Sequence, residues 1–290
     1  MDITKVIATE LGIRTRQVEA VIQLIDEGNT IPFIARYRKE AHGGLNDEVL
    51  RNLDERLTYL RNLEERKEAV LKSIEEQEKL TPELKKSIED AMTLVAVEDL
   101  YRPYKQKRRT RATIAKEKGL EGLANIIQLQ MGKQPLEQEA TAYINEEKGV
   151  ASAKEAIQGA MDILAETVAD NAQYRTWIRN ITWKEGILTS AAKDKEAESV
   201  YEMYYDFSEA VAKIAGYRVL AINRGEKEKV LTVKIEAPEE KILRYLEKQV
   251  IVQENPYTTP VLQEICADSY HRLIMDSIER DIRNELTEHA

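Results

Sequence analysis

The chain has 290 residues, of which 42% are hydrophobic and 33% charged, with only 12 glycines, 7 prolines and a net charge of −9. This length suffices for two domains, and the scarcity of turn-forming residues argues against a β-sandwich and favours long helices. An acidic chain of this kind does not coat nucleic acid over its whole surface. The sequence has no apolar run of about 18 residues and no signal-like start, so we expect a cytoplasmic protein without a membrane segment.

The first part of the chain is predicted to be a series of helices. Thr81-Pro82 begins the last helix of this series, and a loop that contains His42-Gly43-Gly44 is expected after Lys39. Apolar spacing and capping residues predict the earlier elements at 3–11, 16–27, 31–39 and 46–79. The last of these would be roughly 50 Å long at about 1.5 Å per residue, which is too long for a compact small domain.

The second part is predicted to be helical with a small β element. Residues 187–190 and 229–235 alternate as strands do, with a helix expected after Ser208. The predicted helices lie near 120–130, 136–146, 153–170 and 172–183, after Pro238, and from Thr259 to the chain end. The fold class is therefore mainly α and multi-helical, with domains at 1–125 and 126–290 and a β element near 187–235.

A basic segment at 102–118 interrupts the acidic chain. It holds eight Lys/Arg residues against the single acidic residue Glu117, a net charge of +7, so the rest of the chain carries −16. Such a local patch is typical of nucleic-acid contact, in which cations hold phosphates and release counterions. The candidate phosphate-binding residues are Lys105, Lys107, Arg108, Arg109 and Arg111, with Tyr104 as a candidate for stacking on bases.

Other interpretations of these residues remain open. The rings of Tyr101 and Tyr104 would also suit packing against neighbouring helices. The basic segment would also suit a contact with another part of the protein, or a face balanced by the chain's own acids. Arg36, Arg38 and Lys39 form a second, weaker patch, which Glu40 follows directly.

The sequence offers no catalytic constellation. Three histidines and one cysteine do not make a usual structural zinc site, and no phosphate loop, nucleophile elbow or dinucleotide fingerprint is present. Cys266 lies among apolar residues at helical spacing, which predicts a buried side chain instead of a nucleophile. We therefore expect no enzyme activity, no cofactor and no metal.

Three stretches resemble the Tex-type transcription accessory proteins of bacteria. They are Ile31-Pro32-Phe33-Ile34-Ala35-Arg36-Tyr37-Arg38-Lys39-Glu40, Val97-Glu98-Asp99-Leu100-Tyr101-Arg102-Pro103-Tyr104-Lys105 with its continuation Lys107-Arg108-Arg109-Thr110-Arg111-Ala112, and Leu220-Ala221-Ile222-Asn223-Arg224-Gly225-Glu226. Their order and spacing are also similar to the family, so the resemblance covers essentially the whole chain.

The resemblance implies a cytoplasmic, nucleic-acid-binding protein whose N-terminal part is helical with a helix-turn-helix-like element. It also implies that YqgF-like, helix-hairpin-helix and OB-fold RNA-binding domains belong to the full-length protein and are absent from this chain. Our leading hypothesis is an N-terminal scaffold that contacts the phosphate backbone of RNA or DNA without reading its sequence. The alternative is a protein-interaction module that docks those further domains, or a transcription or translation partner.

Overall fold

The computed structural model describes all residues, 1–290, and the chain divides into two compact units, Met1–Tyr101 and Arg102–Ala290. The sequence placed the domain boundary later, between residues 125 and 126. The earlier position follows from packing, because the helices formed by 111–129 lie against a long helix of the second unit, 153–169.

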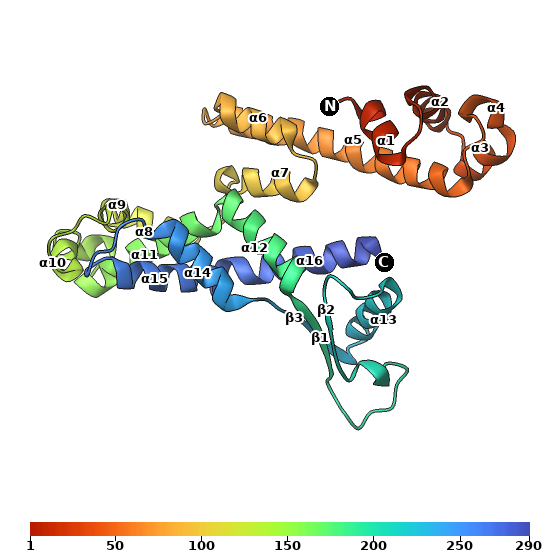
Figure 1. The fold of residues 1–290 in the computed structure, drawn as a ribbon. Helices are drawn as coiled ribbons and strands as arrows, with labels where there is room; N and C mark the ends of the chain where they lie inside the picture. Colours follow the sequence, from red (N-terminus) through yellow and green to blue (C-terminus); the bar gives the residue numbers. More distant parts are fainter. The chain divides into compact units, whose positions relative to one another are not determined.

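The first unit is built on one long helix, α5, with shorter helices packed along it (Figure 1). Its elements are α1 (Ile3–Leu11), α2 (Thr15–Asp26), α3 (Ile31–Tyr37), α4 (Lys39–His42), α5 (Asp47–Glu76), α6 (Pro82–Asp90) and α7 (Leu94–Tyr101). The helices predicted at 3–11, 16–27, 31–39 and 46–79 are confirmed, and the predicted loop after Lys39 contains the short α4. The helix predicted from Thr81-Pro82 ends at Asp90, and the separate helix α7 was not predicted. The helix-turn-helix-like character of the start stays a prediction.

The apolar stripe of α5 explains why this helix organises the unit. Leu50, Leu53, Leu57, Leu60 and Leu63 are all buried, and their i, i+3, i+7 spacing keeps them on one face. The opposite face of α5 is strongly charged. None of the helices in the chain has the length and apolar character needed to cross a membrane. The stripe therefore faces other helices of the unit.

Ion pairs add to this packing at the edges of the stripe. Arg56 of α5 holds Glu10 of α1 at 2.6 Å, Arg61 holds Asp26 at 2.7 Å, and Arg66 holds Glu98 of α7 at 2.5 Å. Each arginine forms two hydrogen bonds to its carboxylate. The two-point geometry fixes the orientation of the shorter helices, although exposed pairs contribute only about 1 kcal/mol or less.

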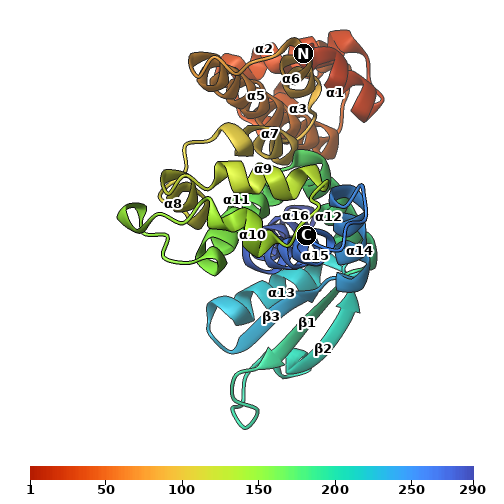
Figure 2. The same ribbon diagram turned by 90° about the vertical axis from the view of Figure 1, so that its left-hand side faces the viewer.

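The second unit surrounds helix α11 with other helices and carries a three-stranded sheet (Figure 2). Its helices are α8 (Arg111–Glu117), α9 (Glu121–Leu129), α10 (Leu136–Thr141), α11 (Ala153–Ala169), α12 (Ala172–Glu185), α13 (Gly216–Lys227), α14 (Glu239–Val250), α15 (Thr259–Asp268) and α16 (Met275–His289). Its strands are β1 (Ile187–Ala192), β2 (Asp206–Ala210) and β3 (Leu231–Glu236). The predicted mainly α fold with a small β element is confirmed.

The sheet has the order β2-β1-β3, with both pairings antiparallel. Thr189 of β1 lies between Ser208 of β2 and Lys234 of β3. The two predicted strands are present, but the third was missed, and the helix expected after Ser208 begins only at Gly216. Residues 206–210 are short and polar, so their strand conformation depends on hydrogen bonds to β1, which the local sequence does not show.

The helix predicted from Thr259 to the chain end is interrupted by a π-helical segment, Ser269–Ile274, between α15 and α16. The buried Ser269 hydroxyl donates a hydrogen bond to the Ala165 carbonyl of α11 at 2.7 Å. The wider turn therefore lies where this helix packs closely against α11. Cys266, just before it, is fully buried as predicted, and burial raises the pKa of its thiol to about 12.

Residues 220–226, the third family-like stretch, hold α13 against α16 and β3. Arg283 of α16 donates hydrogen bonds to Asn223 at 2.9 Å and to Glu226 at 2.8 Å. Gly225 is needed for close packing, because a Cβ there would lie 2.6 Å from the Leu231 side chain and 3.2 Å from Tyr201. The glycine thus lets β3 approach the helix.

Replacing Gly225 with alanine should destabilise the second unit. The added methyl group meets Leu231 in a packed core, and overpacking of this kind costs about 2 kcal/mol, more than the helix gains from losing a glycine. Urea unfolding of Gly225→Ala measures the loss. Gly132→Ala is the matched control, because a Cβ at that position meets nothing within 4 Å and should leave stability unchanged. Equal stabilities of the two variants would contradict the packing argument.

Candidate nucleic-acid interface

The basic segment begins the second unit as a 3₁₀ turn, an irregular stretch and a short helix. Arg102–Tyr104 form the turn, and α8 begins after Thr110, whose hydroxyl accepts a hydrogen bond from the Thr113 amide at 3.1 Å. Pro103 and this Thr cap are the local signals that divide the segment. The cations of the irregular stretch between them differ in exposure and in ion pairing.

Lys107 is not available to a ligand, because it lies between two carboxylates of its own chain. Its ammonium is 2.8 Å from Glu166 of α11 and also forms a close ion pair with Asp170, the residue that follows α11. Thr110 adds a hydrogen bond to Glu166 at 3.4 Å. Two carboxylates at a helix C-terminus repel each other and the helix dipole, so the lysine offsets both penalties. Burial raises the pKa of Asp170 despite the neighbouring lysine.

Three cations of the segment remain exposed without an ion pair. Lys105, Arg108 and Arg111 are exposed, and no acidic side chain of the chain lies within ion-pair distance of them. Arg109 forms an ion pair with Glu117 at 3.1 Å, but both side chains are largely exposed. A phosphate can replace such a partner at little cost, because exposed pairs are weak.

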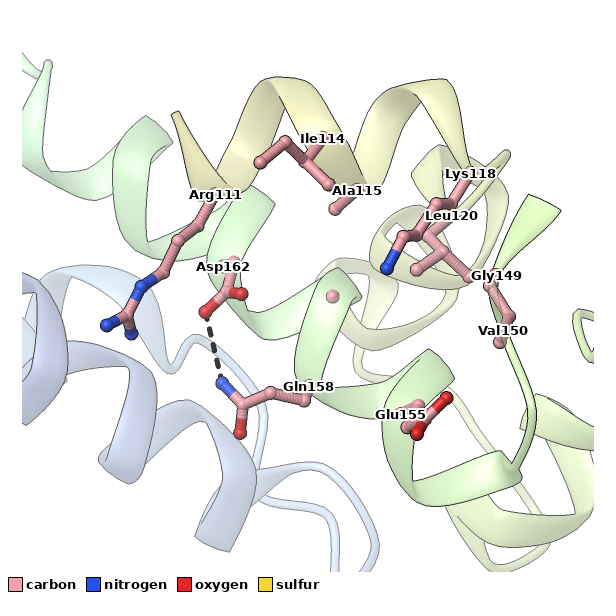
Figure 3. A pocket seen from close by; sticks show the side chains of 11 residues that line it. Arg111, Ile114, Ala115, Lys118, Leu120, Gly149, Val150, Glu155, Gln158 and Asp162 are labelled. Carbon is pink, nitrogen blue, oxygen red and sulfur yellow. Dashed lines mark hydrogen bonds between the residues drawn. The ribbon is translucent and has the colours of Figure 1, made fainter. Parts of the chain in front are cut away.

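A hollow of about 310 Å³ lies beside α8, between this helix, α11 and the loop at Gly149. Figure 3 shows Arg111 and Lys118 at its edge, both from the α8 side, and Gln158 bonded to Asp162 on α11. Glu155 also lines it and accepts a hydrogen bond from the Ala151 amide. Because α11 contributes the two carboxylates Glu155 and Asp162, the hollow does not favour binding of an anion inside it. Arg111 and Lys118 are therefore available to an anion only at its edge.

The two candidate tyrosines of the segment differ in their surroundings. The Tyr101 hydroxyl is 2.9 Å from the Ser73 hydroxyl, and Arg66 lies over its ring at 5.3 Å, so this ring packs within the first unit. Tyr104 is half-buried in the 3₁₀ turn. The interpretation of Tyr101 as a packing residue is therefore correct, and the stacking role of Tyr104 stays a prediction.

The second patch, on α3 and α4, is also divided by an ion pair. Arg38 holds Glu40 at 2.9 Å, whereas Arg36 and Lys39 are exposed and unpaired. Sequence reasoning missed the residues beside them, Phe33 and Tyr37, whose rings are also exposed. Their i, i+4 spacing was visible, but aromatic residues at that spacing are usually taken as core.

Comparisons with known proteins agree with the family resemblance. Residues 1–75 match the Tex-like protein N-terminal domain, and residues 132–290 match the Tex central region-like family. The chain is 50% identical over 287 residues to the uncharacterized protein YdcI of Bacillus subtilis and 42% identical over 283 residues to the transcriptional accessory protein Tex of Neisseria gonorrhoeae. These matches cover 98% and 96% of the chain. The chain therefore belongs to the Tex family, as the three sequence stretches predicted.

The similarity extends to a human protein. The S1 RNA-binding domain-containing protein 1 of Homo sapiens is 29% identical over 306 residues, which covers all of this chain. The chain spans only 40% of the Bacillus protein, 36% of the Neisseria protein and 30% of the human protein. It therefore corresponds to the N-terminal and central regions that the two family models describe.

Replacing Lys107 with methionine should destabilise the chain by about 2 kcal/mol near neutral pH, because two largely buried carboxylates then lose their cation. The loss of the lysine raises the folded-state pKa of Asp170 further above its ordinary value. The loss in free energy of unfolding is therefore full above the folded-state pKa of Asp170. It shrinks as the pH falls towards the ordinary pKa of an aspartate, below which the carboxyl is protonated in both the folded and the unfolded state. Urea unfolding at about pH 7 and about pH 5 measures this difference.

Arg109→Met is the matched control within the same segment. Its partner Glu117 is exposed, so we expect a change below about 0.5 kcal/mol and no pH dependence of that change. A Lys107 variant as stable as this control at both pH values would show that the lysine does not anchor the segment.

Proposed function

We propose that the chain is the N-terminal scaffold of a nucleic-acid-binding transcription accessory protein, which holds the phosphate backbone of RNA or DNA without reading its sequence. The observation that carries this proposal is the set of exposed, unpaired cations, Lys105, Arg108 and Arg111, on a segment that Lys107 fixes to α11. We further propose that the scaffold is cytoplasmic and has no catalytic centre of its own.

Fixing the segment matters for binding. A flexible basic tail loses conformational entropy when it binds, whereas a segment already held by Lys107 and Thr110 loses less. Each phosphate that a cation neutralises releases counterions, so the contact is favourable but salt-dependent. These are backbone contacts, which position a nucleic acid and carry no sequence information.

The names of two relatives support the proposal. One is called a transcriptional accessory protein, and another is named for an S1 RNA-binding domain. Both extend well beyond the region that this chain matches, so the scaffold would act together with those further regions. In such an arrangement a weak backbone contact contributes to binding through effective concentration.

A docking function is the second candidate, and one surface favours it. Leu129 and Met131 are 65% and 68% exposed, and Val252 is 79% exposed. Gln130, between the first two, binds the backbone of Val250 and Val252, which brings these apolar side chains to one end of the second unit. Apolar side chains gathered on a surface are typical of contact with another protein or domain.

The nucleic-acid proposal predicts a specific loss of salt dependence. Replacing Lys105, Arg108 and Arg111 together with alanine should lower the slope of log affinity against log salt by about 2 to 3, since each phosphate contact contributes roughly 0.7 to 0.9. Fluorescence polarisation with labelled RNA and DNA across a salt series measures this slope.

The matched control replaces three exposed lysines elsewhere in the second unit, Lys193, Lys195 and Lys213, with alanine. This control changes the net charge equally, and we expect its slope to stay near that of the parent. Equal effects of both triple variants would indicate a general charge effect, and an unchanged slope in the first would favour docking.

A further inference from the structure

Helix α3 carries two exposed aromatic rings side by side. Phe33 is 41% exposed and Tyr37 60% exposed, and their ring centroids are 5.2 Å apart at an interplanar angle of 45°. Residues four apart lie on the same face of a helix, so both rings are presented together. Phe33 is one of only two phenylalanines in the chain, and leaving it in water forgoes the stability that burial would supply.

Unpaired cations lie around these rings. The Arg36 guanidinium is 6.0 Å from the Tyr37 ring centroid. Lys39 of α4 and Arg51 of α5 line the same open hollow, of about 1020 Å³, together with Phe33 and Tyr37. None of the three cations forms an ion pair with an acidic side chain of the chain. Cations beside exposed aromatic faces are the combination that binds single-stranded nucleic acid.

The charge of the hollow decides between a single strand and a duplex. Asp47 and Glu48, in the first turn of α5, also line it and offset two of the three cations. Such a surface attracts a polyanion only weakly, so electrostatics alone does not hold a duplex, whose bases are stacked on each other. Unpaired bases, in contrast, bring their faces to the rings and need only a few phosphate contacts.

The α3 surface is held rigidly. Ile34, which lies between Phe33 and Tyr37 in the sequence, is fully buried. The Phe33 amide donates a hydrogen bond to the Thr30 hydroxyl, which caps the start of α3. The buried His42 ring binds the Ile34 carbonyl through Nε2 at 3.0 Å and accepts the Leu45 amide at Nδ1. These bonds hold α3, α4 and the start of α5 in one arrangement, which reduces the entropy lost on binding.

We infer that α3 and the start of α5 form a single-strand platform, on which unpaired bases stack against Phe33 and Tyr37 while Arg36, Lys39 and Arg51 hold the adjoining phosphates. This inference rests on the proposed function, because it assumes that the chain binds nucleic acid, and it adds a binding site on α3 and the start of α5. A peptide partner is the competing occupant of the same surface. The hollow is open and lacks an enclosed apolar pocket to anchor a peptide side chain.

The test uses the full chain, a labelled polypyrimidine strand, a duplex of equal length, and a single strand that contains 2-aminopurine. Phe33→Leu combined with Tyr37→Leu should weaken single-strand binding by about tenfold or more and abolish the quenching of 2-aminopurine that ring stacking causes. Duplex binding and the salt slope should not change, because the cations are intact. Circular dichroism confirms that the variant is folded, as is expected for exposed side chains.

Tyr217→Leu is the matched control, because Tyr217 is 67% exposed with Arg218 over its ring but lies on α13. Replacing Arg36, Lys39 and Arg51 with alanine should lower the slope of log affinity against log salt for the single strand. The quenching of 2-aminopurine, measured at saturating protein, should stay unchanged because both rings are intact. Single-strand binding that survives loss of both rings would overturn the platform, while salt-dependent binding through Lys105, Arg108 and Arg111 would still support the proposed function. A parent chain that binds neither strand nor duplex overturns both.

Discussion

The ion pairs of Lys107 with Glu166 and Asp170 determine what the basic segment can do. They hold Lys107, within the basic segment, against the end of α11, and the hydrogen bond from Thr110 to Glu166 extends this attachment to the residue before α8. Desolvating the Asp170 carboxylate is unfavourable, as the raised pKa of Asp170 indicates, so this position requires a cation. Lys107 therefore stabilises the fold, and its attachment to α11 holds the neighbouring exposed cations in place at the surface.

Much of the helical architecture was predictable, because α-helices depend on local sequence. The leucine stripe of α5, the Asn46 cap and the Thr81-Pro82 start determine their elements without reference to the rest of the chain. Elements that depend on distant partners were missed. Strand β2 forms because it pairs with β1. The π-helical segment at 269–274 lies where Ser269 bonds to Ala165 of α11, about a hundred residues earlier in the sequence.

The candidate interface was predictable as a charge pattern but not as a set of available side chains. Eight cations in 102–118 are evident in the sequence, yet nothing there shows that Lys107 pairs with residues some sixty positions later, or that Arg109 pairs with Glu117. The exposure of Phe33 was also hidden, since a phenylalanine four residues before a tyrosine normally predicts a buried helix face. The surroundings of each side chain, which only the fold supplies, separate anchors from free groups.

The three family-like stretches illustrate two different reasons for an unusual sequence. In 220–226, Asn223 and Glu226 hold Arg283 of α16, and Gly225 gives room to Leu231, so the stretch is explained by packing within the second unit. In 31–40 and 97–112, packing explains only part of the sequence. Ile34 and Lys107 serve the fold. The side chains of Phe33, Tyr37 and Arg36 are exposed and contact one another, and Arg108 and Arg111 are exposed without an ion pair. Side chains that the fold does not use, displayed on rigid elements, are where contact with another molecule is expected.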